Sequence, residues 1–195
     1  MNQAQIKRAL AKDFSDENFD MTEDGIYFPN HGIVASGIYI DRTNGGEWEQ
    51  TSNLVTKEGR IAALDTYFGT KVKPSGLYLA LFNGAAAPAA NWTAANFAAT
   101  AGEIVSLTEG FNSATRPAYT PADATDQEYI DNFSSVARIT IVTSNELTVT
   151  GAAVLTSSAR GGTTGVLVSA AKFAAARTFQ NGDIYELGYR ISFTS

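Results

Sequence analysis

The C-terminal run 183-DIYELGYRISF-193 alternates between large apolar residues and small or charged ones almost without interruption. Its apolar positions are Tyr185, Leu187, Tyr189, Ile191 and Phe193. A period of two is typical of a strand that buries one face and leaves the other in water. Such a strand needs a second layer over its apolar face, so the chain is expected to fold around at least one covered sheet.

Other short runs rich in β-branched or large apolar residues predict further strands. They are 77-LYLALF-82, 136-VARITIV-142, 146-ELTVTGAAVL-155 and 165-GVLVSA-170. The first is apolar at every position, as a strand covered on both faces would be. Turn dipeptides such as Asn83-Gly84 end the runs, and helical patterns between them are rare. The pattern predicts a mainly β chain, with a β-sandwich or jelly-roll-like domain.

One helix is predicted after 51-TSN-53, where polar side chains can cap its free amides. Its apolar residues fall on one side and are Leu54, Ile61, Leu64 and Phe68. Gly69 stands where the chain would leave the helix through a left-handed residue. We therefore expect this helix to pack on the sheet through its apolar side.

The first fifty residues have a different character. Ile6, Leu10 and Phe14 have helical spacing, which predicts a short amphipathic helix within residues 3–14. An acidic stretch and two apolar runs interrupted by proline and glycine follow. We expect residues 1–50 to form an extended N-terminal arm with a short helix and short strands, and residues 51–195 to form the β domain with long loops.

Composition excludes several classes of partner. The net charge is -6, the pI is about 4.8 and no Lys/Arg cluster occurs, which argues against binding to nucleic acid. No run approaches a membrane-spanning length, so no membrane partner is expected. The chain has no cysteine, and its first residues, MNQAQIKRALAKDF, lack the apolar centre of a signal peptide. We expect synthesis and folding in a cytoplasm.

No motif indicates an enzyme. His31 is the only histidine, in the turn-like 29-PNHG-32, and no nucleophile-elbow sequence accompanies it. The glycines of 161-GGTTG-165 lack the lysine of a phosphate-binding loop and are typical of a hairpin loop. The acidic stretch begins like a calcium loop at Asp16, but Met21 occupies the position that needs glycine. We expect no catalytic activity, no cofactor and no metal site.

The segment 83-NGAAAPAANWTAANFAATAGE-103 is too poor in large side chains to form a core of its own. Trp92 and Phe97, together with Phe111 and Tyr119 further along, are aromatic residues in surroundings rich in Ala, Thr and Pro. Such residues are typical of interface anchors, and they can equally fold back onto their own domain. The N-terminal apolar stripe has the same two interpretations, so all seven residues are candidate interface residues.

Four segments together resemble a group of structural proteins of tailed bacteriophages. They are 53-NLVTKEGRIAALDTYF-68, 77-LYLALFNGAAAPAANWTAANFAATAGEI-104, 109-EGFNSATRPAYTPA-122 and 161-GGTTGVLVSAAKFAAARTFQNGDIYELGY-189. In that group the corresponding segments recur in this order. The resemblance implies a virion protein on the capsid surface, most readily a head decoration or cement protein. Its partner would be the major capsid protein, whose subunits it would bridge on the assembled head, and it would form a homo-oligomer, a trimer or dimer.

Two alternatives remain open at this point. The first is a structural role in the tail, at the base of a spike or fibre. The second is a carbohydrate-binding β-sandwich, in which Trp48 and Trp92 would be the platforms for sugar rings.

Overall fold

The computed structural model describes residues 19–21, 27–29 and 34–194, and the chain divides into two compact units. The first unit includes strands β1 (Phe19–Met21) and β2 (Tyr27–Pro29), which pair antiparallel with Phe19 opposite Pro29. The second unit spans Ala35–Phe193. The candidate residues Ile6, Leu10 and Phe14, and also His31, lie outside the described residues.

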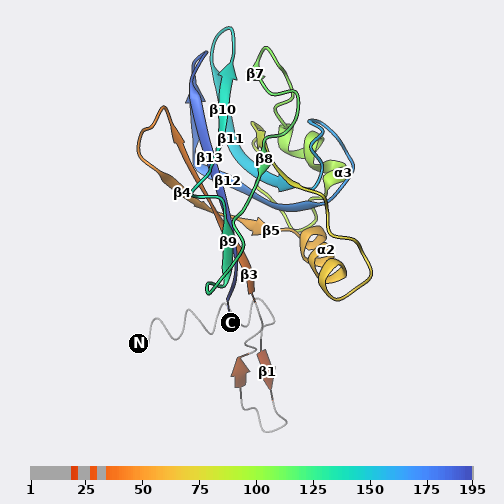
Figure 1. The fold of residues 1–195 in the computed structure, drawn as a ribbon. Helices are drawn as coiled ribbons and strands as arrows, with labels where there is room; N and C mark the ends of the chain where they lie inside the picture. The colour runs from red at the N-terminus through yellow and green to blue at the C-terminus, as the bar shows by residue number, and fades with distance from the viewer. Residues whose placement is uncertain (1–18, 22–26, 30–33, 195) are drawn as a thin grey trace. The chain divides into compact units, whose positions relative to one another are not determined.

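The second unit contains two sheets, whose registered strand pairs are antiparallel (Figure 1). One sheet has the order β4-β3-β13-β10-β7, with β9 on β13, and the other has the order β5-β12-β11-β6-β8. The strands of the first are β3 (Val34–Thr43), β4 (Glu49–Ser52), β7 (Gly110–Phe111), β9 (Tyr129–Asp131), β10 (Ala137–Val142) and β13 (Ile184–Thr194). Those of the second are β5 (Leu54–Val55), β6 (Leu77–Phe82), β8 (Ala118–Tyr119), β11 (Leu147–Leu155) and β12 (Leu167–Phe179). The expectation of a mainly β, sandwich-like chain is confirmed.

The main core lies between the two sheets and follows the predicted alternation of β13. Tyr185, Leu187 and Tyr189 are buried against residues of the opposite sheet. The alternation fails at three positions, one of which is the buried Gly188 on the face expected in water. Phe193, expected in the core, is 51% exposed, while Glu186, expected in water, is only 4% exposed. Glu186 is buried because it accepts hydrogen bonds from the guanidinium groups of Arg42 and Arg138.

A second, smaller core lies on the other face of the β6–β11–β12 sheet. Strand β6 supplies both cores, since Leu79 and Leu81 belong to the first while Ala80 and Phe82 belong to the second. Residues 83–103, which we call the cover segment, supply α3 (Ala94–Phe97) and a π-helical turn, η1 (Ala98–Gly102). Figure 1 shows α3 beside this sheet, on the side away from β10 and β13. The prediction that β6 is covered on both faces is confirmed.

Helix α2 (Lys57–Tyr67) differs from the expectation of a helix packed through its apolar side. It begins later than predicted, because Leu54 belongs to β5 and Thr56 is the N-cap. Only Gly59 among its residues is buried, with its Cα so close to Val168 that an added Cβ would stand 2.3 Å from the Val168 carbonyl oxygen. The apolar side faces away from the sheet, and Phe68 ends the helix in a right-handed conformation without a left-handed Gly69.

Strands β3 and β4 belong to the β4-β3-β13-β10-β7 sheet. Residues 35–50, which we expected in the arm, therefore lie in the second compact unit. Asn44, with φ of 51°, and Gly45, with φ of 72°, form the turn that joins these two strands. Over the part of the chain that the structure describes, no helix is long and apolar enough to cross a membrane.

Candidate functional site

A buried ion pair joins the cover segment to the loops beside it. Arg116 Nε and Nη2 donate to the two carboxylate oxygens of Glu103, at 2.7 and 2.8 Å. Their side chains are 0% and 1% exposed, so both charges are removed from water. The backbone amide of Gly161 also donates to Glu103, and Arg116 donates to the carbonyl oxygen of Ser157. The loop of residues 161–165 thus binds the Glu103 carboxylate through the amide of Gly161.

A second carboxylate makes an equivalent connection at the start of α2. One oxygen of Glu58 accepts hydrogen bonds from the amides of Ala94, at 2.8 Å, and Leu167, at 2.7 Å. Glu58 therefore joins α2 to α3 and to the first residue of β12. Together with the Glu103–Arg116 pair, it links four segments that are separate in the sequence, 53–68, 77–104, 109–122 and 161–189.

Arg160 fixes the neighbouring loops without a carboxylate partner. Its guanidinium carbon lies 3.7 Å from the centre of the Phe111 ring. The same group donates to four carbonyl oxygens, those of Ile104, Ser106, Phe111 and Ser113. Burial lowers the pKa of Arg160 from its ordinary value. Sequence reasoning did not select this residue, because its partners are backbone atoms of distant segments.

The four described aromatic candidates belong to the core of the chain itself. Trp92 is 4% exposed, Phe97 0%, Phe111 1% and Tyr119 3%. The rings of Trp92 and Phe97 pack edge to face against Phe82, with centroids about 6 Å apart. The structure brings Trp92 and Phe97 together in the second core and places Phe111 and Tyr119 in the first. Buried side chains offer no surface to a partner, so they are not carried forward as contact residues.

The same burial contradicts the use of Trp92 as a platform for sugar rings. Trp48 is 40% exposed, and the guanidinium of Arg42 stacks over its ring at 4.3 Å. Of the two tryptophans named for the carbohydrate alternative, only Trp48 is exposed, and Arg42 partly covers its ring.

A layer of tyrosines crosses the main core. The hydroxyl of Tyr39 lies 2.9 Å from Ser169 Oγ on the opposite sheet, and Asn53 Nδ2 donates to the Tyr189 hydroxyl at 2.8 Å. The ring of Tyr189 packs against Tyr39 and Tyr119. Burial raises the pKa of Tyr189 to about 12 and raises the pKa values of Tyr39 and Tyr119 as well.

We predict that this layer makes the chain unfold in alkali. An unfolded tyrosine ionises near pH 10, whereas these buried hydroxyls must stay neutral in the fold. Their stabilising contribution is therefore complete below about pH 10 and is lost as the pH rises toward their folded pKa values. Tyrosinate absorbance should appear together with loss of near-ultraviolet circular dichroism. Full ionisation of Tyr39, Tyr119 and Tyr189 in a chain that keeps its native spectrum would contradict the prediction.

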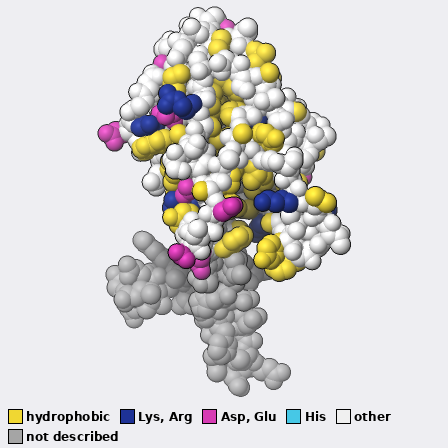
Figure 2. Space-filling view, in the orientation of Figure 1, with side chains coloured by type: hydrophobic (Ala, Val, Ile, Leu, Met, Phe, Trp, Pro, Cys, Tyr) yellow, Lys and Arg dark blue, Asp and Glu magenta, His cyan; other side chains and the backbone are white. Residues whose placement is uncertain are grey.

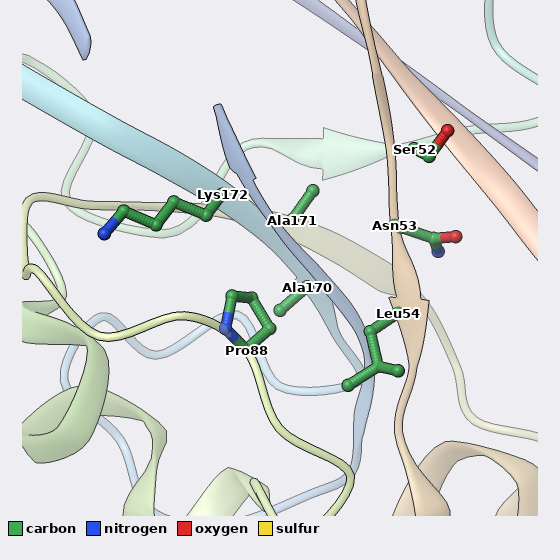
Figure 3. Close-up of a pocket in the computed structure, with 7 residues that line it drawn as sticks. All are labelled: Ser52, Asn53, Leu54, Pro88, Ala170, Ala171 and Lys172. Atoms are coloured by element: carbon green, nitrogen blue, oxygen red, sulfur yellow. The ribbon is translucent and has the colours of Figure 1, made fainter. Parts of the chain in front are cut away.

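The depression beside β5 and β12 has a volume of about 250 Å³ and does not have the features of a reaction site. Figure 3 shows Leu54, Pro88 and Ala170 at its centre. The amide of Asn53 and the ammonium group of Lys172 lie at opposite ends and point away from each other. Lys172 instead donates to the carbonyl oxygen of Ala85. Catalysis requires polar groups that converge, and these do not.

The most exposed apolar surface lies on the last turns of α2 and the residues that follow. We call it the α2 patch, and its apolar members are Ile61, Leu64, Tyr67, Phe68 and Val72, which are 46%, 59%, 83%, 79% and 89% exposed. Exposed basic residues surround them: Lys57, Arg60, Lys71 and Lys73. Figure 2 shows apolar and basic side chains together at the lower right, where Figure 1 places α2. Sequence reasoning selected Ile61, Leu64 and Phe68 but assigned them to the interior, and it did not select Tyr67 and Val72.

The patch stays exposed because α2 is attached only by its first turn. Thr56 Oγ1 donates to the Leu167 carbonyl oxygen, and the amides of Thr56 and Lys57 donate to the carbonyl oxygens of Val168 and Ala90. The later turns contribute no buried residue. A groove of about 550 Å³ extends the patch toward residues 90–93 and 165–166. An exposed apolar surface of this kind is typical of a protein contact site.

Among the described residues, no three His, Cys, Asp or Glu side chains lie where they could hold a metal ion together. No known protein family model matches the sequence, and no curated protein matches it either. A function is therefore inferred from the residues and contacts of this chain.

Proposed function

We propose that this chain is a structural protein of a tailed-bacteriophage virion, a decoration or cement protein that binds the outer surface of the assembled head. One observation carries the proposal. The four segments that resemble phage structural proteins are separate in sequence, yet Glu58 and Glu103 tie them into one region. These contacts make the four segments one connected structural region.

The stabilising mechanism is mass action. A protein that binds only the assembled shell lowers the free energy of that state, by about 2.7 kcal/mol per site at a concentration one hundred times its dissociation constant. Contacts to adjacent major capsid protein subunits bridge them, and many copies add their effects. A covered sandwich that buries Trp92, Phe97, Phe111 and Tyr119 is a suitable rigid body for this purpose. No chemical step is required.

Purified chain added to heads that lack it tests this function. We expect saturable binding and a higher temperature for release of the packaged DNA. Heads already carrying the protein serve as the control, because their sites are occupied and neither quantity should change. Binding to isolated tails in place of heads would support the tail alternative. Binding to neither, with retention on a glycan array that is lost in the Trp48→Ala variant, would support the carbohydrate alternative.

A further inference from the structure

We propose that the α2 patch of one copy is the docking site for the acidic N-terminal arm of a second copy. The arm segment is residues 13–28, 13-DFSDENFDMTEDGIYF-28, of which 13–24 contain six carboxylates and no basic residue. The inference rests on the proposed function, because a decoration layer places identical copies side by side. It concerns the contact between copies and leaves the capsid contact unassigned.

The α2 patch and the arm segment carry opposite charges. The stretch 57–73 carries four basic and two acidic residues, although the whole chain has a net charge of -6. One of its carboxylates, Glu58, is occupied by backbone amides, and the other, Asp65, pairs with Lys71 at 2.7 Å. The surface that remains is basic on an acidic protein. The arm segment has the opposite charge, so the two attract each other and like surfaces of two copies repel.

The α2 patch and the arm segment also both contain apolar residues that can pack together. Tyr67 and Phe68 are about four-fifths exposed, and their rings pack edge to face with centroids 4.8 Å apart. The neighbouring groove of about 550 Å³ is lined partly by Ile61, Ala62 and Val166. The arm segment contains aromatic residues among its carboxylates, for example Phe14 and Phe19. A partner of this composition satisfies both the apolar centre and the basic rim of the patch.

Strands β1 and β2 of the arm form a two-stranded sheet. Two paired strands are only marginally stable alone in water, so this pair gains stability from a surface that covers it. Exchange of arms between neighbours supplies that surface in every copy of a layer.

The test is the self-association of the full chain, measured by analytical ultracentrifugation with three variants. The patch variant carries Leu64→Ser and Phe68→Ser. The arm variant carries Asp16→Asn, Glu17→Gln, Asp20→Asn and Glu23→Gln. A charge control makes the same change at four exposed carboxylates of the sandwich and carries Asp123→Asn, Asp126→Asn, Glu128→Gln and Glu146→Gln.

We expect the wild type and the charge control to associate with similar affinity. The patch and arm variants should each weaken association on the order of tenfold or more. A mixture of these two variants should recover one-sided association, because the intact arm of one copy can dock on the intact patch of the other. Added salt should weaken wild-type association, since it screens the exposed charges.

Three results would overturn the proposal. A wild type that stays monomeric excludes a contact between copies, and an arm variant that associates like wild type assigns the patch to another surface. A mixture that recovers no association shows that the arm does not dock on another copy's patch. None of these results affects binding to heads, which tests the proposed function separately.

Discussion

Replacing Arg116 by alanine will lower the free energy of unfolding by about 3–5 kcal/mol, one of the two largest losses that we expect from a single substitution in this chain. The Glu103 side chain is 1% exposed, and it would lose its two charged hydrogen bonds. An uncompensated buried charge is costly because the surrounding protein cannot replace the lost hydration. Urea denaturation with constant slope measures the change directly.

Arg138→Ala is the matched control for that experiment. Arg138 also pairs with a glutamate, Glu186, at 2.9 Å, but its own side chain is 66% exposed. Its removal should cost less than about 1 kcal/mol, because the Arg138 guanidinium is largely in water and Glu186 keeps its ion pair with Arg42 at 2.6 Å. The double variant Glu103→Leu, Arg116→Met should be less destabilised than Arg116→Ala, since it leaves no unpaired charge. Equal effects of Arg116→Ala and Arg138→Ala would contradict the buried pair.

Replacing Phe97 by alanine will cost about 3–5 kcal/mol, because it opens a cavity in the second core. Phe97 is 0% exposed and packs against both Phe82 and Trp92. Without this ring, the cover segment loses a large part of the apolar contact that holds it on the sheet. We expect a lower unfolding midpoint, and faster proteolysis within residues 83–103 than elsewhere in the sandwich.

Phe68→Ala provides the comparison for Phe97→Ala. Phe68 is 79% exposed at the end of α2, so its loss should change stability by no more than about 0.5 kcal/mol. The two substitutions remove the same atoms from opposite environments. If they destabilise the chain equally, the cover segment is not part of the core.

Strands with a strong local pattern were predictable from the sequence. The alternation of 183–189 and the apolar run 77–82 correspond to β13 and β6. Strand β12 continues to Phe179, well beyond the predicted 165–170, through the alanine-rich 170-AAKFAAA-176. Alanine has little intrinsic strand preference, so this extension is determined by pairing with β11 across the sheet.

The direction of an apolar surface was harder to predict. The stripe of α2 was visible in the sequence, but the helix is attached through Thr56 and Gly59, which leaves the stripe in water. Conversely, the sequence left open whether Trp92 and Phe97 contact a partner or their own domain, and in the structure they pack with Phe82 in the second core. A local sequence pattern indicates which residues share one face of an element. What that face packs against depends on contacts between distant segments.

The candidate site was predictable only in part for the same reason. Glu103, Arg116 and Gly161 meet in space although they are separated by other strands and loops. A single sequence contains no local signal that pairs them. The basic rim of the α2 patch was not predicted either, because Lys57, Arg60, Lys71 and Lys73 are spread over residues 57–73 and form no cluster in the sequence.

The most direct test of the proposed virion role is to purify virions from a culture that produces this chain, to separate them into heads and tails, and to count the chain in each fraction by quantitative mass spectrometry. The account predicts many copies on heads, in a fixed ratio to the major capsid protein that matches the symmetry of the shell. Absence of the chain from heads, or a single ring of copies confined to tails, would contradict it.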